Sequence, residues 1–139
     1  MIAIDTNVLL RYLLADDALQ HKKAKNLIEK NKVLVTDVVL AETIWTLTGK
    51  RYSLSKEQVC EVLHSLMSDN GIYFESNQVI WSALQDFENS VKIQGKALDF
   101  ADSLIANKAH SVANANNDSL EGFYSYDKAV SQLRGAKKP

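Results

Sequence analysis

The sequence predicts an α/β fold: a three-layer α/β/α domain with a central, mainly parallel sheet of about four or five strands. A short apolar run, Met1–Ile4, is followed at once by an apolar stretch suited to a helix, Val8–Leu14. A strand that leads directly into a helix is the start of a parallel α/β unit. Further short apolar runs separated by helical patterns follow along the chain, and 139 residues suffice for one domain with a real core.

The remaining elements follow from apolar periodicity. Further strands are expected at Val33–Thr36, Ile72–Glu75 and Gly122–Ser125. Helices are expected over 19–30, 38–50, 56–68, 77–95 and 98–113, with a last helix around Ala129, Val130 and Leu133. We find no linker or repeat, so residues 1–139 are expected to be a single domain whose tail is mobile from about residue 135.

Capping residues mark several helix ends. Asp37 follows a strand and is predicted to cap the next helix, and Asn77 is predicted to cap a later one. Ser55 and Gln58 have the spacing of a capping box. Gly95 is predicted to end the helix that Asn77 begins.

Composition excludes several classes of protein. The apolar share of 46% and the charged share of 24% are typical of a globular protein. The net charge of −1 gives no global field for nucleic acid, which argues against a pure nucleic-acid-binding module and less strongly against a nuclease. The single cysteine, Cys60, allows no internal disulfide. No apolar run could span a membrane and no signal peptide is evident, so we expect a cytoplasmic protein.

Five acidic residues occupy places where a site could form. Asp5 follows the first predicted strand and Asp127 the last, at the sheet edge where parallel α/β proteins bind ligands. Asp99 and Asp102 lie three residues apart near a helix start, and therefore on one face. Glu42 lies in a predicted helix, on a different face from its apolar stripe.

Clustered carboxylates repel one another unless a cation joins them. Oxygen ligands suit Mg²⁺ or Mn²⁺, and such an ion could activate water for phosphodiester hydrolysis. The competing interpretation takes each acid alone: Asp5 and Asp127 as helix caps, Asp99 and Asp102 as first-turn charges, and Glu42 as an exposed side chain.

Four segments resemble a known family in the right order. Ile4–Asp17 resembles the opening of PIN-domain ribonucleases, in particular VapC-type toxins of bacterial toxin–antitoxin pairs. Val39–Thr43 resembles the family's second acidic motif, Leu98–Ala106 the third and Tyr124–Lys128 the last. The resemblance covers essentially the whole chain and implies a PIN-like fold and a metal-dependent endoribonuclease.

The resemblance also implies a site. One or two Mg²⁺ or Mn²⁺ ions would be held for hydrolysis of RNA, with a cognate antitoxin that blocks the site and often a homodimer. Ser125 stands where threonine is usual, and residues 114–121 form a longer loop that could alter substrate choice. Carried over residue by residue, the acids are Asp5, Glu42, Asp102 and Asp127, with Asp99 as a supporting residue or the true ligand, and Ser125 as a residue that helps to position the metal or its water.

Basic side chains at the rim of such a site would position RNA phosphates. The candidates are Arg11, the Lys22 to Lys25 cluster, Lys50, Arg51 and Lys128, each of which is also compatible with an ordinary surface charge.

Two alternatives belong to other classes. A PIN-fold module could bind RNA or protein without cutting, but all four acids are present, and a degenerate site usually loses one. A phosphotransfer enzyme of the haloacid-dehalogenase kind would use Asp5 as phosphoacceptor, but that chemistry requires an aspartate at position 7, where this chain has Asn7.

Overall fold

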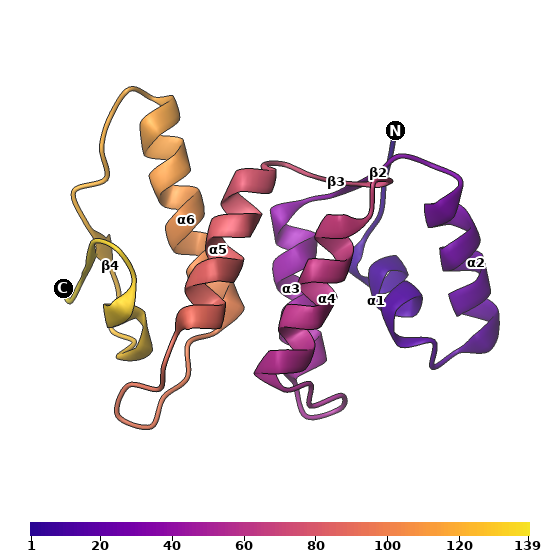
Figure 1. Ribbon diagram of the computed structural model, residues 1–139, viewed down its shortest axis with the longest axis horizontal. Helices are drawn as coiled ribbons and strands as arrows, with labels where there is room; N and C mark the ends of the chain where they lie inside the picture. Colours follow the sequence, from indigo (N-terminus) through magenta and orange to yellow (C-terminus); the bar gives the residue numbers. More distant parts are fainter. The chain divides into compact units, whose positions relative to one another are not determined.

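The computed structural model describes residues 1–139 and has the mixed α/β fold with a parallel sheet that the sequence predicted (Figure 1). It contains six α-helices and one 3₁₀ helix. Its contacts divide the chain into two compact units, Met1–Asn77 and Gln78–Pro139. Each unit carries some of the predicted site residues. No helix in either unit is both long and apolar enough to cross a membrane.

The N-terminal unit is built on a three-stranded parallel sheet with strand order β1-β2-β3. Ala3 pairs with Leu34 and Leu34 pairs with Tyr73, so the three strands run in register toward one carboxyl edge. Two helices connect each strand to the next. The elements are β1 (Ile2–Ala3), α1 (Thr6–Leu14), α2 (Ala18–Glu29), β2 (Val33–Val35), α3 (Asp37–Thr48), α4 (Lys56–Ser68) and β3 (Ile72–Phe74).

The prediction of four or five strands in the central sheet was wrong, because that sheet has three. The strand expected at Gly122–Ser125 forms as β4 (Phe123–Tyr124), but it pairs with β5 (Ala136–Lys137) in a separate parallel ladder. The physical reason is that the C-terminal tail, which was expected to be mobile, supplies β4 with its hydrogen-bonding partner.

Helix caps explain where the helices of this unit begin. The predicted capping box is confirmed: Ser55 accepts a hydrogen bond from the Gln58 N–H, and the Gln58 side chain accepts one from the Ser55 N–H. The prediction for Asp37 was wrong, because the preceding Thr36 is the cap of α3 and accepts from the Val39 N–H at 3.4 Å. Asp37 is instead the first residue of that helix.

The core of the N-terminal unit is aliphatic. The stripe of α3 formed by Leu40, Ile44 and Leu47 is buried, whereas Val38 and Trp45 on the other face are each 67% exposed. Complete burial of such a side chain contributes about 1.5–3 kcal/mol to folding. The fully buried aliphatic side chains of this unit are Leu9, Val33, Val35, Leu40, Leu47, Val59, Leu63 and Leu66.

In the C-terminal unit, two helices pack against each other and carry a small β ladder. The buried Ser103 hydroxyl donates to the Ala83 carbonyl at 2.6 Å, and the rings of Phe87 and Phe100 meet edge-on at 5.9 Å. A second cluster, which includes Val130 and Leu133, covers the inner side of the ladder. The elements are α5 (Asn77–Asn89), α6 (Phe100–Ala115), β4, a 3₁₀ helix η1 (Ala129–Gln132) and β5.

Three local predictions differ from the structure here. Asn77 is the first residue of α5 rather than its cap, and α5 ends at Asn89 rather than at Gly95. Gly95 lies in a tight turn with φ of 80°, a conformation that glycine adopts at little cost. The last predicted helix is a single 3₁₀ turn, at whose end the Leu133 N–H donates to the Val130 carbonyl at 2.9 Å.

Candidate active site

Asp5 stands at the carboxyl end of β1 and caps α1. Its Oδ1 atom accepts the Val8 N–H at 3.0 Å, and the side chain is exposed. A carboxylate at this place interacts favourably with the positive end of the helix dipole. Its second oxygen faces no hydrogen-bond donor and is available to a ligand.

Glu42 is brought to the same place from α3. Its Oε2 atom accepts a hydrogen bond from the Thr6 hydroxyl at 2.7 Å, across 36 residues of sequence. Thr6 directly follows Asp5 in the chain. Two of the predicted acids therefore lie at the start of α1, and Glu42 is exposed there rather than buried.

Two further acids lie at the carboxyl edge of this sheet, and sequence reasoning did not place them in the site. Asp37 follows β2 and Glu75 follows β3, and Glu75 Oε2 accepts the Asp37 N–H at 2.6 Å. The Asp37 carboxylate oxygens are buried. The sequence marks these two acids as it marks Asp5, by an acid at the end of a buried strand. Asp37 was interpreted as a helix cap instead.

In the C-terminal unit, Asp99, Asp102 and Asp127 form a second acidic group. Asp99 is the cap residue of α6 without a side-chain cap hydrogen bond, and Asp102 lies in the first turn of that helix. Burial, with the negative charges of Asp99 and Asp127, raises the pKa of Asp102 above its ordinary value. The three acids are therefore close enough to act on one another electrostatically.

Ser125 orients the segment that carries Asp127. The Ser125 hydroxyl oxygen accepts the Asp127 N–H at 3.0 Å, and Asp127 Oδ1 accepts the Ala129 N–H at 2.9 Å. These short-range hydrogen bonds hold the turn after β4 in one conformation. Asp127 is half-buried and Ser125 does not itself donate to it, so the serine acts on the backbone.

The donor set suits a hard divalent cation, because every predicted ligand is a carboxylate or hydroxyl oxygen. Burial and the charges of Asp99 and Asp127 disfavour the ionised form of Asp102, and a cation would offset that penalty. Within either unit, however, no three His, Cys, Asp or Glu side chains are arranged as a metal-binding group.

The Arg11 side chain, a candidate for phosphate binding, forms an ion pair within the N-terminal unit. Its guanidinium lies 2.9 Å from Asp16, which also accepts from the Tyr52 hydroxyl at 3.3 Å. Burial opposes ionisation of Asp16, but the hydrogen bond and charge of Arg11 lower its pKa. The His21 ring nitrogen Nδ1 lies 2.9 Å from the Arg11 carbonyl oxygen, which supports a structural role for that histidine.

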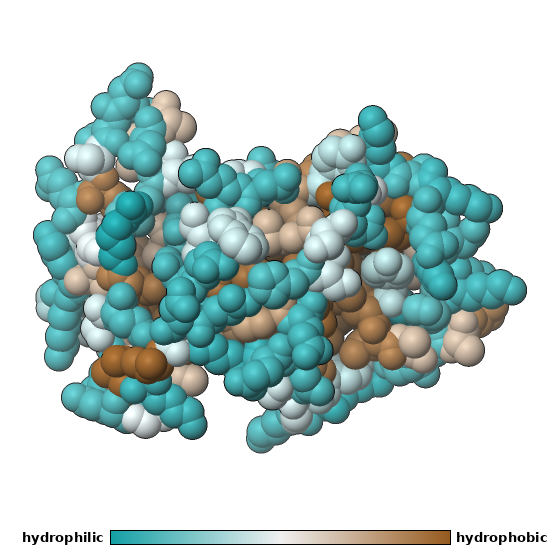
Figure 2. All heavy atoms as spheres, viewed as in Figure 1, coloured by the Kyte–Doolittle hydropathy of each residue, from teal (hydrophilic) through white to brown (hydrophobic).

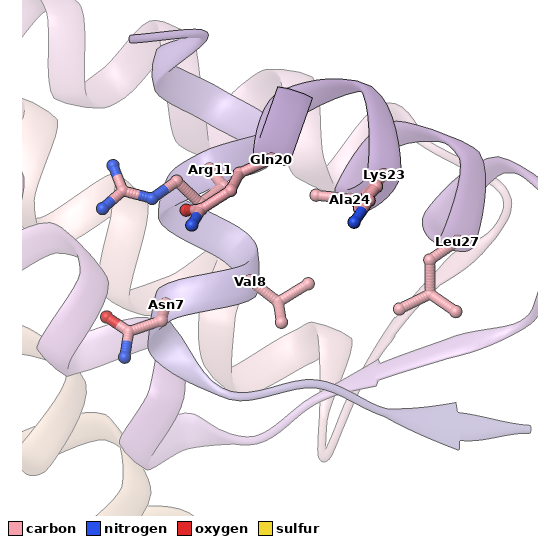
Figure 3. A pocket seen from close by; sticks show the side chains of 7 residues that line it. All are labelled: Asn7, Val8, Arg11, Gln20, Lys23, Ala24 and Leu27. Carbon is pink, nitrogen blue, oxygen red and sulfur yellow. The ribbon is translucent and has the colours of Figure 1, made fainter. Parts of the chain in front are cut away.

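A shallow, mainly apolar groove of about 260 Å³ lies between α1 and α2. Figure 3 shows Val8 and Leu27 pointing into it from opposite helices, with Gln20 and Lys23 along α2. Figure 2 shows hydrophobic surface over this part of the N-terminal unit. None of the residues that line the groove is acidic, although Asn7 and Val8 belong to the first turn of α1.

A parallel α/β unit with acids after its strands belongs to the class of folds that hold a ligand at the carboxyl edge of a sheet. The PIN domain family matches residues 2–116, and the chain therefore belongs to that family, whose members are generally nucleases. The match includes Asp5, Glu42, Asp99 and Asp102 but ends before Asp127. No curated protein matches the chain significantly.

Proposed function

We propose that this PIN domain is a metal-dependent endoribonuclease and the toxin of a toxin–antitoxin pair. The observation that carries the proposal is the hydrogen bond between Thr6 and Glu42, which joins the acid of α3 to the start of α1 where Asp5 caps the helix. Both residues lie within the match to the PIN family, whose members are generally nucleases, and this supports the proposal.

The proposed ligand set is the one that the resemblance to PIN-domain ribonucleases implies. Asp5 and Asp102 would contact Mg²⁺ or Mn²⁺ directly, Asp127 directly or through water, and Glu42 would share in metal binding or orient water. When bound, the ion supplies positive charge that favours ionised water and offsets charge on the phosphoryl oxygens. Thr6 would hold the Glu42 carboxylate in one orientation, and Ser125 would hold the backbone of Asp127.

The chain's own residues also explain why the ion would matter. Without it, burial and the negative charges of Asp99 and Asp127 make the ionised form of Asp102 less favourable. Asp5 accepts the Val8 N–H through one carboxylate oxygen and keeps the other for coordination. The residues would therefore bind the ion and orient a water for in-line attack on the phosphorus atom. The P–O bond to the ribose would break and release the ribose oxygen.

The partners are part of the proposal. RNA is the substrate in the cytoplasm, an antitoxin protein covers the acidic site, and the chain forms a homodimer. Expression without the antitoxin should arrest growth of a bacterial host, and Asp5→Asn should relieve that arrest. Growth arrest by the variant to the same degree would contradict a toxic nuclease.

The decisive experiment is cleavage of a labelled total-RNA pool by the purified protein with Mg²⁺, with Mn²⁺ and with a chelator. Asp5→Asn, prepared identically, controls for contaminating ribonuclease. Metal-dependent cutting by the wild type alone supports the proposal. Equal cutting by both proteins is contamination. If neither protein cuts RNA but both bind it, the result favours a binding module without nuclease activity.

A further inference from the structure

A second cavity, of about 230 Å³, lies in the C-terminal unit around the loop that joins β4, η1 and β5. Ser125 and Asp127 line it together with Lys128, Lys137 and Lys138. It therefore contains one of the acids of the proposed active site. The cavity is formed within one unit, and its two tail lysines had no role in the sequence prediction.

The charge of this cavity is positive. Three lysines line it against the single carboxylate of Asp127, and none of the three ammonium groups is paired with a carboxylate. Lysines that are held together without acidic partners favour an anion, and a phosphate group is the common anion that ammonium groups bind. The cavity thus differs from the chain as a whole, whose net charge is −1.

The backbone of Lys137 is fixed by the ladder. It pairs with Tyr124, and its carbonyl accepts the Ser125 N–H at 3.0 Å. Its aliphatic stem passes over Gly122, where a Cβ atom would lie 3.0 Å from Lys137 Cδ and 3.0 Å from Tyr124 Cε2. Glycine at 122 therefore leaves the space through which the stem of Lys137 reaches its position.

Aromatic side chains stand beside these lysines. Tyr126, which lines the cavity, is 79% exposed, and Tyr124 in β4 is 60% exposed. Exposed rings beside a basic groove are the arrangement that proteins use for single strands, since bases stack on the rings while phosphates meet the cations. A duplex keeps its bases stacked internally and offers none to the rings.

We propose that this cavity binds the backbone of single-stranded RNA, with Lys128, Lys137 and Lys138 contacting phosphates and Tyr126 stacking on a base. This inference rests on the proposed function, because it seats the strand beside Asp127. It extends that function by assigning the C-terminal strand β5 to substrate binding. The proposed contacts are made by the chain itself and need no metal.

The test is binding of a fluorescent single-stranded RNA to the full-length Asp5→Asn protein in the presence of a chelator. Fluorescence anisotropy measures the affinity. Lys137→Gln/Lys138→Gln should weaken binding several-fold, and by up to about twenty-fivefold, since each exposed contact is worth up to about fivefold. The salt dependence should also fall, by about 0.7 in log–log slope for each lost phosphate contact. Lys30→Gln/Lys32→Gln removes the same charge from exposed positions outside the cavity and is the matched control.

The variant Gly122→Ala tests the position of the Lys137 side chain without a change of charge. It keeps all three lysines but forces the Lys137 stem to give by a few tenths of an ångström, so it should weaken RNA binding about twofold, less than the loss of one contact does. Tyr126→Ala should reduce the preference for single-stranded over double-stranded RNA, with an unchanged salt slope. Unchanged melting temperatures would show that these variants fold.

Equal losses from the cavity pair and the control pair would overturn the inference, and so would absence of RNA binding by the Asp5→Asn parent. Equal affinity of the parent for duplex and single strand would overturn it as well. The proposed function fails by a different result, namely no metal-dependent cleavage by the wild type. A protein that binds RNA through these lysines without cutting would satisfy this inference and refute the nuclease.

Discussion

The Thr6 hydroxyl donates a 2.7 Å hydrogen bond to Glu42 Oε2, and this contact links the first residue of α1 to the middle of α3. It places a second carboxylate beside the strand end that carries Asp5. Because the contact is exposed, it orients the Glu42 carboxylate and adds little to the stability of the fold.

Thr6→Val keeps the side-chain shape but removes the donor. We expect kcat/KM for RNA cleavage to fall about tenfold, equivalent to about 1.4 kcal/mol, because the Glu42 carboxylate loses its fixed orientation. Thr6→Ser retains the hydroxyl and should stay close to wild type. A Val variant with wild-type kinetics would show that this contact has no part in the chemistry.

Metal binding should stabilise the protein. At a Mg²⁺ or Mn²⁺ concentration about ten times Kd, the gain of about 1.4 kcal/mol raises the melting temperature by about 5 °C. Asp5→Asn should abolish most of this shift. Asp17→Asn is the matched control, because Asp17 caps α2 through the Gln20 N–H at 3.0 Å just as Asp5 caps α1. Loss of the shift in both variants would point to a general effect of capping.

Asp102 should make stability depend on pH in the metal-free protein. Burial and the charges of Asp99 and Asp127 raise its pKa above the unfolded value, so its stabilising contribution is complete below about pH 4 and is lost as pH rises through the folded pKa. At pH 7 the neutral Asp102→Asn variant should therefore melt higher than wild type. Because Asp102 is half-buried, solvent screening limits the gain to about 1–3 °C.

Melting curves in a chelator from pH 3.5 to pH 8 measure this difference. The two proteins should converge at the acidic end. A variant that melts lower than wild type at pH 7 would mean that ionised Asp102 has a favourable partner, contrary to the cause of its raised pKa.

Asp99 and Asp102 are expected to differ as metal ligands. Asp102→Asn should lower Mn²⁺ affinity more than Asp99→Asn does, by about tenfold, because the charges of both Asp99 and Asp127 act on Asp102. Isothermal titration of Mn²⁺ into each variant gives the two constants. The reverse order would identify Asp99 as the direct ligand.

The packing of α5 against α6 depends on Ser103. Its fully buried hydroxyl donates to the Ala83 carbonyl at 2.6 Å, so Ser103→Ala should lower the free energy of unfolding by about 1–2 kcal/mol. Urea denaturation measures it. Ser131→Ala removes an exposed bond to the Lys128 carbonyl and should cost less than about 0.5 kcal/mol. Similar losses for both would show that burial at Ser103 adds nothing.

The sequence was sufficient to predict elements whose evidence is local. The capping box of Ser55 and Gln58, and the apolar stripe through Leu40 and Leu47, depend on contacts within a few residues. Asp5 at the end of β1 was predicted for the same reason, since a buried apolar run followed by a cap is a short-range signal. The prediction that the helix from Asn77 runs to Gly95 was wrong, because a helix period over a few residues cannot show where the helix stops.

The tertiary structure alone decided which distant residues meet. Nothing near Glu42 in the sequence indicates that Thr6 donates to it, and nothing near Lys137 indicates that it pairs with Tyr124. The second contact belongs to the ladder of β4 and β5, and two-residue strands leave almost no pattern of their own in the sequence. The first is a side-chain hydrogen bond between α1 and α3, which no local signal marks. The sequence therefore determined which acids and helices exist, and long-range hydrogen bonding decided which of them face one another.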